Sequence, residues 1–85
     1  MPKTIHGGGH PHLVAVLTEA RLRSGLTQVQ LAERVGKDQS LISLIERGQR
    51  RVDVTEFVAL ARAMEADPAE LFADVLSRLP EKISI

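Results

Sequence analysis

The sequence predicts an all-α domain of five short helices. Apolar residues recur at the i, i+3, i+4 spacing of one helix face in successive segments, and capping residues and glycines mark the ends of those segments. No stretch before the last five residues shows the period-two alternation of a half-buried strand. The 85 residues can enclose one modest core, and a chain without cysteine has neither disulfides nor a thiolate metal site.

The first two helices are bounded by proline, a capping box and glycine. Pro11 suits the first turn of a helix, and Gly25 is expected to close it. Thr27 and Gln30 form a capping box for the second helix, which Gly36 ends with the positive φ that glycine adopts without strain. Their predicted inward faces are Leu13, Val16, Leu17, Ala20 and Ser24, and then Val29, Leu31, Ala32 and Val35.

The third helix is predicted within the stretch QSLISLIERG, with Asp38 as its N-cap and Gly48 after its end. Because successive helical residues lie about 100° apart, Leu41, Ile42 and Ile45 share its buried side. The opposite side consists of Ser40, Ser43 and Arg47, flanked by Gln39 and Leu44. Two short helices joined by GKD, the second with a polar outward face, predict a helix-turn-helix.

The last two helices each begin at an aspartate. Asp53 and Glu56 form a capping box ahead of FVALARAM, and DPAE at 67–70 supplies an N-cap, a first-turn proline and a capping-box acid. Pro80 stops the fifth helix. The predicted inward face of the fourth helix is Phe57, Leu60, Ala61 and Met64.

The formal charge is zero, but the charges are unevenly distributed. Between Pro11 and Arg51 there are seven basic and four acidic residues, a net charge of +3. From Val52 to Ile85 there are three basic and seven acidic residues, a net charge of −4. Lys3 contributes the remaining positive charge. Such polarity is typical of a molecule with one anion-facing half, although ordinary solvated faces account for it equally well.

The polar face of the third helix suits a DNA groove. A B-form major groove admits one α-helix, the first turns of which reach the base edges, and helix N-termini bind phosphate oxygens. A glutamine at that place, such as Gln39, can donate to and accept from one adenine edge.

Several motifs match a known family at the same time. They are Arg21 and Arg23 before SGLTQ, LAE, Gly36, Ile42, IERG, ALARAM and DPAELF. The segment that contains them, about Leu13 to Phe72, resembles the Cro and phage-repressor type of helix-turn-helix domain, also called the xenobiotic-response-element family. The resemblance implies a five-helix, lambda-repressor-like fold with the third helix in the major groove.

The resemblance also implies roles for particular residues. Gln28 is expected to contact a phosphate and brace Gln39, or else to be merely exposed in the first turn. Leu44 either contacts a thymine methyl or packs between the second and third helices. Arg21 and Glu46 are expected to form a structural ion pair. Expected base contacts are Gln39, Ser40, Ser43 and Leu44, and expected phosphate contacts are Gln28, Lys37, Arg47, Arg50 and Arg51, the last of which is equally well explained as a solvated loop charge.

A single small domain covers too few base pairs for tight, specific binding, so a homodimer on a palindrome is expected. With no appended sensor domain in the sequence, the dimer surface is expected in the fifth helix and the tail, where KISI alternates like a short strand. The alternative is that apolar residues of this helix, Leu71 and Phe72 in particular, complete the monomer's own core. The predicted dimer residues are Val75, Leu76, Leu79, Ile83 and Ile85.

The start of the chain, with its HGGGHPH stretch, suggests other classes. HGGG resembles an oxyanion-hole segment of lipases and esterases, but no serine lies in a G-x-S-x-G elbow, which argues against a hydrolase. Three histidines in a glycine-rich terminus favour adventitious metal binding over a functional site. The expected organisation is a flexible arm at 1–10, the DNA-binding domain at 11–79 and a tail at 80–85.

The sequence therefore predicts a non-enzymatic, homodimeric DNA-binding transcriptional regulator, with a repressor favoured and no cofactor or metal. It lacks a membrane span and a signal peptide, which favours the cytoplasm. The alternative is an antitoxin-like interaction module that has this fold but binds a toxin and has weak or no affinity for DNA.

Overall fold

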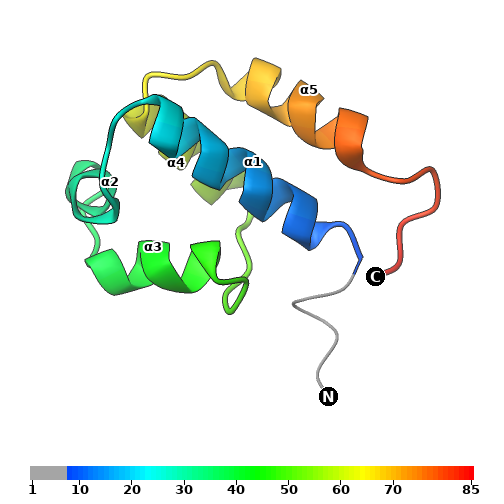
Figure 1. Ribbon diagram of the computed structural model, residues 1–85, viewed down its shortest axis with the longest axis horizontal. Coiled ribbons are helices and arrows are strands. Elements are labelled where there is room, and N and C mark those ends of the chain that lie inside the picture. The colour runs from blue at the N-terminus through cyan, green and yellow to red at the C-terminus, as the bar shows by residue number, and fades with distance from the viewer. Residues whose placement is uncertain (1–7) are drawn as a thin grey trace.

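All five predicted helices are present in the computed structural model, which describes residues 8–85 (Figure 1). They are α1 (His10–Arg23), α2 (Gln28–Arg34), α3 (Gln39–Glu46), α4 (Val54–Ala63) and α5 (Pro68–Arg78). The described residues contain no strand, so the all-α prediction is confirmed. None of these helices is long and apolar enough to cross a membrane.

The core lies where the inward faces of the five helices meet. α1 runs between α5 on one side and α3 on the other, with α4 behind it (Figure 1). Among the predicted inward residues, Ser24 and Val29 are instead exposed. Val29 points away because it lies two residues, about 200° around the helix, before the buried Leu31. The buried cluster is Val16, Leu17, Ala20, Leu31, Ala32, Ile42, Ile45, Phe57, Leu60, Ala61, Met64, Leu71 and Val75.

Two of the three predicted capping boxes form. The Thr27 hydroxyl accepts from the Gln30 N–H at 3.0 Å, and the Gln30 side chain accepts from the Thr27 N–H at 2.9 Å. Asp53 and Glu56 make the same reciprocal pair at 2.7 and 3.0 Å. These boxes fix where α2 and α4 begin.

Asp67 and Asp38 occupy the other two predicted N-cap positions, but neither takes part in a capping box. Asp67 caps α5, but its carboxylate accepts from the Ala69 N–H at 2.9 Å, so no capping box forms with Glu70. Asp67 has a ψ of 115°, compared with 167° and 173° at the two boxed N-caps, and this directs its side chain to a different amide. Asp38 occupies the N-cap of α3 without a side-chain hydrogen bond.

The turn between α2 and α3 depends on Gly36, whose φ is +69°. A Cβ at this position would meet no atom within 4 Å, so the turn requires glycine for its torsion angle rather than for space. The Lys37 N–H donates to the Ala32 carbonyl at 2.9 Å and closes the end of α2. The predicted glycine exit from this helix is confirmed, and it sets the direction in which α3 leaves.

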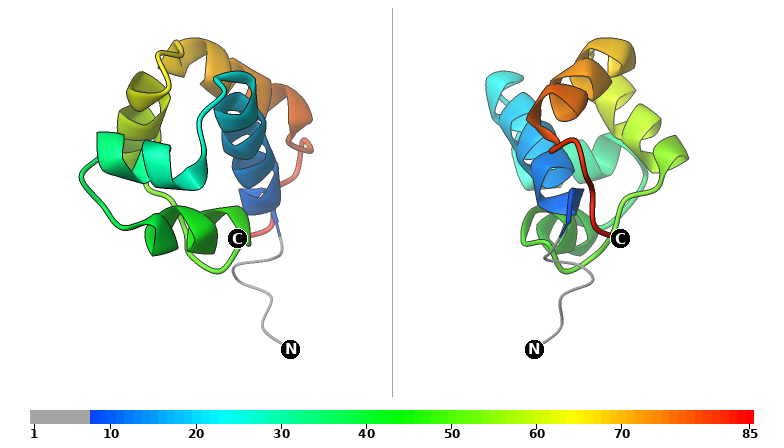
Figure 2. Two further views of the ribbon diagram at one scale, coloured as in Figure 1. Left: turned by 60° about the vertical axis from the view of Figure 1, so that its left-hand side comes forward. Right: turned by 90° about the vertical axis from the view of Figure 1, so that its right-hand side faces the viewer.

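The start of α1 is part of the folded domain. α1 begins at His10, one residue before the predicted Pro11. A Cβ on Gly8 would clash with the backbone of Ser84, because the C-terminal tail passes beside the start of α1 (Figure 2). The predicted flexible arm at 1–10 was therefore too long, and its residues 1–7 lie outside the described residues.

His10 is a buried side chain and not a mobile metal ligand. Only 9% of the residue is exposed, and its Nε2 accepts from the Val52 N–H at 3.2 Å. Burial, aided by the positive charge of Arg51, lowers the pKa of His10 below its ordinary value of 6.5. Among residues 8–85, no group of three or more histidine, cysteine, aspartate or glutamate side chains could hold a metal ion.

Acidification is expected to destabilise the fold through His10. The pKa of His10 is lower in the folded state, so the unfolded chain binds more protons as the pH falls through its ordinary value of 6.5. The stabilising contribution is complete above that value and is lost as the pH falls through the lower folded-state pKa. Urea unfolding at about pH 8 and about pH 5 measures the effect. His10→Gln, whose amide oxygen can accept from the same N–H, is expected to lose less stability over this range; an equal loss would contradict the assignment.

Candidate nucleic-acid interface

α3 presents a polar face to solvent at one edge of the molecule (Figure 2). Its inward side is anchored by Ile42 and Ile45, which are 2% and 3% exposed. The predicted base-contacting residues all lie on the other side: Gln39 and Ser40 are exposed at the N-terminal end, Ser43 is half-buried, and Leu44 is exposed.

Leu44 is an apolar group within this polar face. It is 37% exposed and is not among the partly buried side chains packed against the core. This exposure shows that Leu44 is not part of the buried core, and its contact with a thymine methyl stays a prediction. A leucine in this position offers the groove an apolar surface beside hydrogen-bonding groups.

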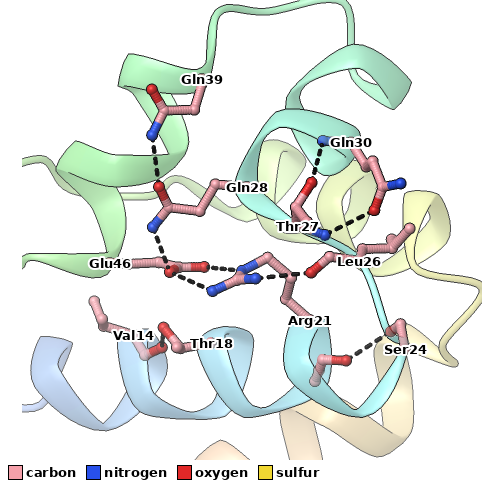
Figure 3. A network of polar contacts seen from close by, with 11 residues as sticks. Val14, Thr18, Arg21, Ser24, Leu26, Thr27, Gln28, Gln30, Gln39 and Glu46 are labelled. Carbon is pink, nitrogen blue, oxygen red and sulfur yellow. Dashed lines mark hydrogen bonds and ion pairs between the residues drawn. The ribbon is translucent and has the colours of Figure 1, made fainter.

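Four side chains from three helices form a continuous chain of hydrogen bonds behind this face (Figure 3). Gln39 of α3 donates through Nε2 to the Oε1 of Gln28 on α2 at 2.7 Å. The Nε2 of Gln28 donates to the Oε1 of Glu46 at 2.9 Å. Arg21 of α1 donates to both carboxylate oxygens of Glu46, from Nε to Oε2 at 2.6 Å and from Nη2 to Oε1 at 3.0 Å.

Arg21 and Glu46, at the inner end of this series of hydrogen bonds, form an ion pair that joins α1 to α3. The side chains of Arg21 and Glu46 are each 11% exposed. The third hydrogen bond of the guanidinium goes from Nη1 to the Leu26 carbonyl at 2.7 Å, in the turn before α2. The hydrogen bonds to Glu46 raise the pKa of Arg21 above its ordinary value. The pair therefore holds α3 in a fixed position relative to α1, with both charges partnered.

The predicted phosphate-contacting cations differ in how they are engaged. Lys37 and Arg47 are exposed near the two ends of α3. Arg50 instead forms an ion pair with Glu56, with 2.7 Å between Nη1 and Oε1, and together with the Asp53 N–H it lowers the pKa of Glu56 to about 2. Arg51 is exposed at the rim of a surface pocket beside the start of α1. Lys37 and Arg47 are thus the cations placed closest along the chain to the polar face.

The residues predicted to form the dimer surface are not all exposed. Leu76 is 55% exposed, and Ile83 and Ile85 of the tail are also exposed, while Leu79 is half-buried. The prediction that Val75 lies on the dimer surface was wrong, because Val75 is 3% exposed and belongs to the monomer's own core.

Phe72 is an apolar residue of α5 that was not among the predicted dimer residues. It is 48% exposed, and its ring meets Phe57 edge to face with centroids 6.2 Å apart. It therefore does not complete the core as the alternative expected, whereas the buried Leu71 does. The described tail, including KISI, forms no strand within the monomer.

A hollow of about 580 Å³ lies between the start of α1, α5 and the tail, close to these exposed side chains. Its apolar lining includes Leu13, Leu79 and Ile83. The exposed side chains Phe72, Leu76, Ile83 and Ile85 are called the α5 patch below.

Comparisons with known proteins agree with the five-helix fold. A family model described as a helix-turn-helix domain matches residues 12–73. An XRE-family like protein from Pseudomonas syringae pv. tomato str. DC3000 is 38% identical, with a TM-score of 0.78 over 85% of this chain and 88% of that chain. No curated protein sequence matches significantly.

Two restriction-modification controller proteins are also similar. C.AhdI from Aeromonas hydrophila is 40% identical, with a TM-score of 0.65 over 71% of this chain and 87% of that chain. C.Esp1396I is 25% identical, with a TM-score of 0.74 over 81% of this chain and 91% of that chain, in a structure of its tetramer bound to its natural 35 base-pair operator.

Proposed function

Since this chain belongs to the XRE family of helix-turn-helix regulators, we propose that it is a sequence-specific repressor that binds a palindromic operator as a homodimer. The observation that carries the proposal is the exposed N-terminal end of α3, where Gln39 is held in place by Gln28. A polar helix face in a fixed orientation is what base readout in the major groove requires.

In the proposed complex α3 lies in the major groove. Gln39, Ser40 and Ser43 contact base edges, and Leu44 contacts a thymine methyl. Lys37 and Arg47 neutralise phosphates on either side of the groove, and their contribution to affinity depends on salt but not on sequence. The operator-bound tetramer of C.Esp1396I supports operator binding by a chain of similar fold.

Selection from a random double-stranded DNA pool, at two salt concentrations, tests the proposal. A palindrome with half-sites about one helical turn apart is expected. Gln39→Ala is expected to abolish the preference at one base pair in each half-site, at a cost of about 1–3 kcal/mol in binding free energy. A selection that yields no motif, with weak binding that vanishes in modest salt, would contradict the proposal.

Salt dependence provides a matched pair of variants. Arg47→Gln is expected to reduce the slope of log affinity against log salt by about one unit per lost phosphate contact in each protomer. Arg62→Gln removes the same charge from an exposed position on α4, at the far end of that helix from α3, and is expected to leave the slope unchanged (Figure 1).

The proposed dimer forms through the α5 patch, and Leu76→Glu is expected to convert it to monomers. A charge in the centre of an apolar contact must be desolvated without a partner, which opposes association. Sedimentation velocity measures the change, and operator affinity is expected to fall with it. Ser77→Glu places the same charge on the polar side of α5 and is expected to leave the dimer intact; monomers in the unmodified protein would rule this interface out.

An antitoxin-like interaction module is the second candidate. The same α5 patch favours it, because a partner protein could cover these side chains as well as a second copy could. This alternative predicts neither a selected DNA motif nor an effect of Gln39→Ala, so the selection experiment separates the two functions.

A further inference from the structure

We propose that the Arg21–Glu46 ion pair determines which base Gln39 reads, by fixing the direction of the hydrogen bonds that reach Gln39 through Gln28. This inference rests on the proposed DNA-binding function. It makes Glu46 and Gln28 positioning residues for base recognition, although Glu46 is largely buried and lies behind the face that would meet DNA (Figure 3).

The direction of these hydrogen bonds is set by Arg21 and Glu46. An arginine side chain has only donors, and an ionised carboxylate has only acceptors. Arg21 directs Nε and Nη2 at the two oxygens of Glu46, and Nη1 at the Leu26 carbonyl. The guanidinium can therefore only donate and the carboxylate can only accept, so the direction of these hydrogen bonds cannot reverse.

Gln28 passes this direction on to α3. An amide side chain can present its oxygen or its NH2 group to a neighbour, and the two orientations have nearly the same shape. The Oε1 of Glu46 lies 2.9 Å from the Gln28 amide nitrogen and can only accept, so the NH2 group of Gln28 must face it. The Oε1 of Gln28 therefore faces the start of α3.

Only one orientation of the Gln39 amide can donate a hydrogen bond to the Oε1 of Gln28. Its Nε2 donates to the Oε1 of Gln28 at 2.7 Å, which leaves its own oxygen and its second N–H for the groove. An adjacent acceptor and donor match the N6 and N7 edge of adenine. With the hydrogen bonds reversed, the Gln39 oxygen would accept from Gln28 and its NH2 group would face the groove, where its two donors match the O6 and N7 acceptors of guanine.

Base preference at a single operator position tests the proposal. The position is identified as the one whose preference Gln39→Ala abolishes in DNA selection. There the unmodified protein is expected to favour adenine over guanine by roughly tenfold or more. Gln28→Met removes the intermediate amide at similar length, and Glu46→Gln replaces the acceptor-only group with one that can face either way. Both are expected to reduce the adenine-to-guanine ratio several-fold while preferences elsewhere in the motif persist.

Gln30→Met is the matched control. Gln30 is also a glutamine of α2, but it bonds to Thr27 in the capping box and is not part of the series of hydrogen bonds from Arg21 to Gln39. Its adenine-to-guanine ratio is expected to remain that of the unmodified protein. The ratio is measured within one bound population, so partial unfolding or a lost phosphate contact does not change it.

Failure of the inference is distinguishable from failure of the proposed function. If Gln39→Ala abolishes the preference but Gln28→Met and Glu46→Gln keep the full ratio, the inference is overturned and the regulator remains. If the unmodified protein selects no motif, both are overturned.

Discussion

Arg21→Met is expected to lower the free energy of unfolding by about 3 kcal/mol, because it leaves the Glu46 carboxylate largely buried without its cation. The same change removes the hydrogen bond to Leu26 that ties α1 to the turn before α2. In a domain of this size, the loss corresponds to a fall in Tm of about 12–24 °C. Urea unfolding followed by circular dichroism measures it.

Two further variants isolate the cause of this loss. Adding Glu46→Gln to Arg21→Met is expected to recover part of the stability, since a neutral amide carries no unpaired charge. Arg78→Met removes an arginine that joins α5 to Glu19 of α1 at 2.7 Å, but that pair is 31% and 47% exposed. Its loss is expected to cost much less stability than the loss of Arg21, because solvent screens an exposed ion pair. Equal costs for the two arginine variants would refute the argument from burial.

Ile42→Ala is expected to cost about 3 kcal/mol of stability. Ile42 is 2% exposed and is one of the two largest fully buried side chains, so its truncation leaves a cavity beneath α3. The measurement is again the free energy of unfolding, and the DNA motif selected by the remaining folded protein is expected to be unchanged.

Leu44→Ala supplies the comparison from the same helix. With 37% of Leu44 exposed and no place in the core cluster, its loss is expected to cost less than about 1 kcal/mol in stability. Its effect is expected in binding instead, as a weakened preference for thymine at one position. If Leu44→Ala proved as destabilising as Ile42→Ala, the leucine would belong to the core, and its proposed contact with DNA would fail.

The helices could be predicted from the local sequence, because the interactions that begin and end each helix join residues only a few positions apart. The capping boxes at Thr27 and Asp53 and the positive φ of Gly36 depend on residues within a few positions of one another. The burial of His10 was not predictable in this way. It depends on the backbone of Val52, which is 42 residues away and is placed there by the loop after α3.

The site was predicted as separate pairs, and the structure joins them. Resemblance to a family suggested both Arg21 with Glu46 and Gln28 with Gln39, but the hydrogen bond from Gln28 to Glu46 requires α2 and α3 to be placed in three dimensions. The error at Val75 has a related cause. The apolar stripe of α5 is wider than one face, and only packing decides which of its members lie inside.

The hydrogen bond from Gln39 to Gln28 also lowers the entropy that Gln39 loses when it binds a base. A free glutamine side chain loses up to about 2 kcal/mol of rotamer freedom when it is immobilised. Because Gln39 is already held at 2.7 Å in the unbound protein, most of that loss occurs during folding. Preorganisation of this kind moves the cost from affinity to stability, so the side chain can meet a base edge without first being ordered.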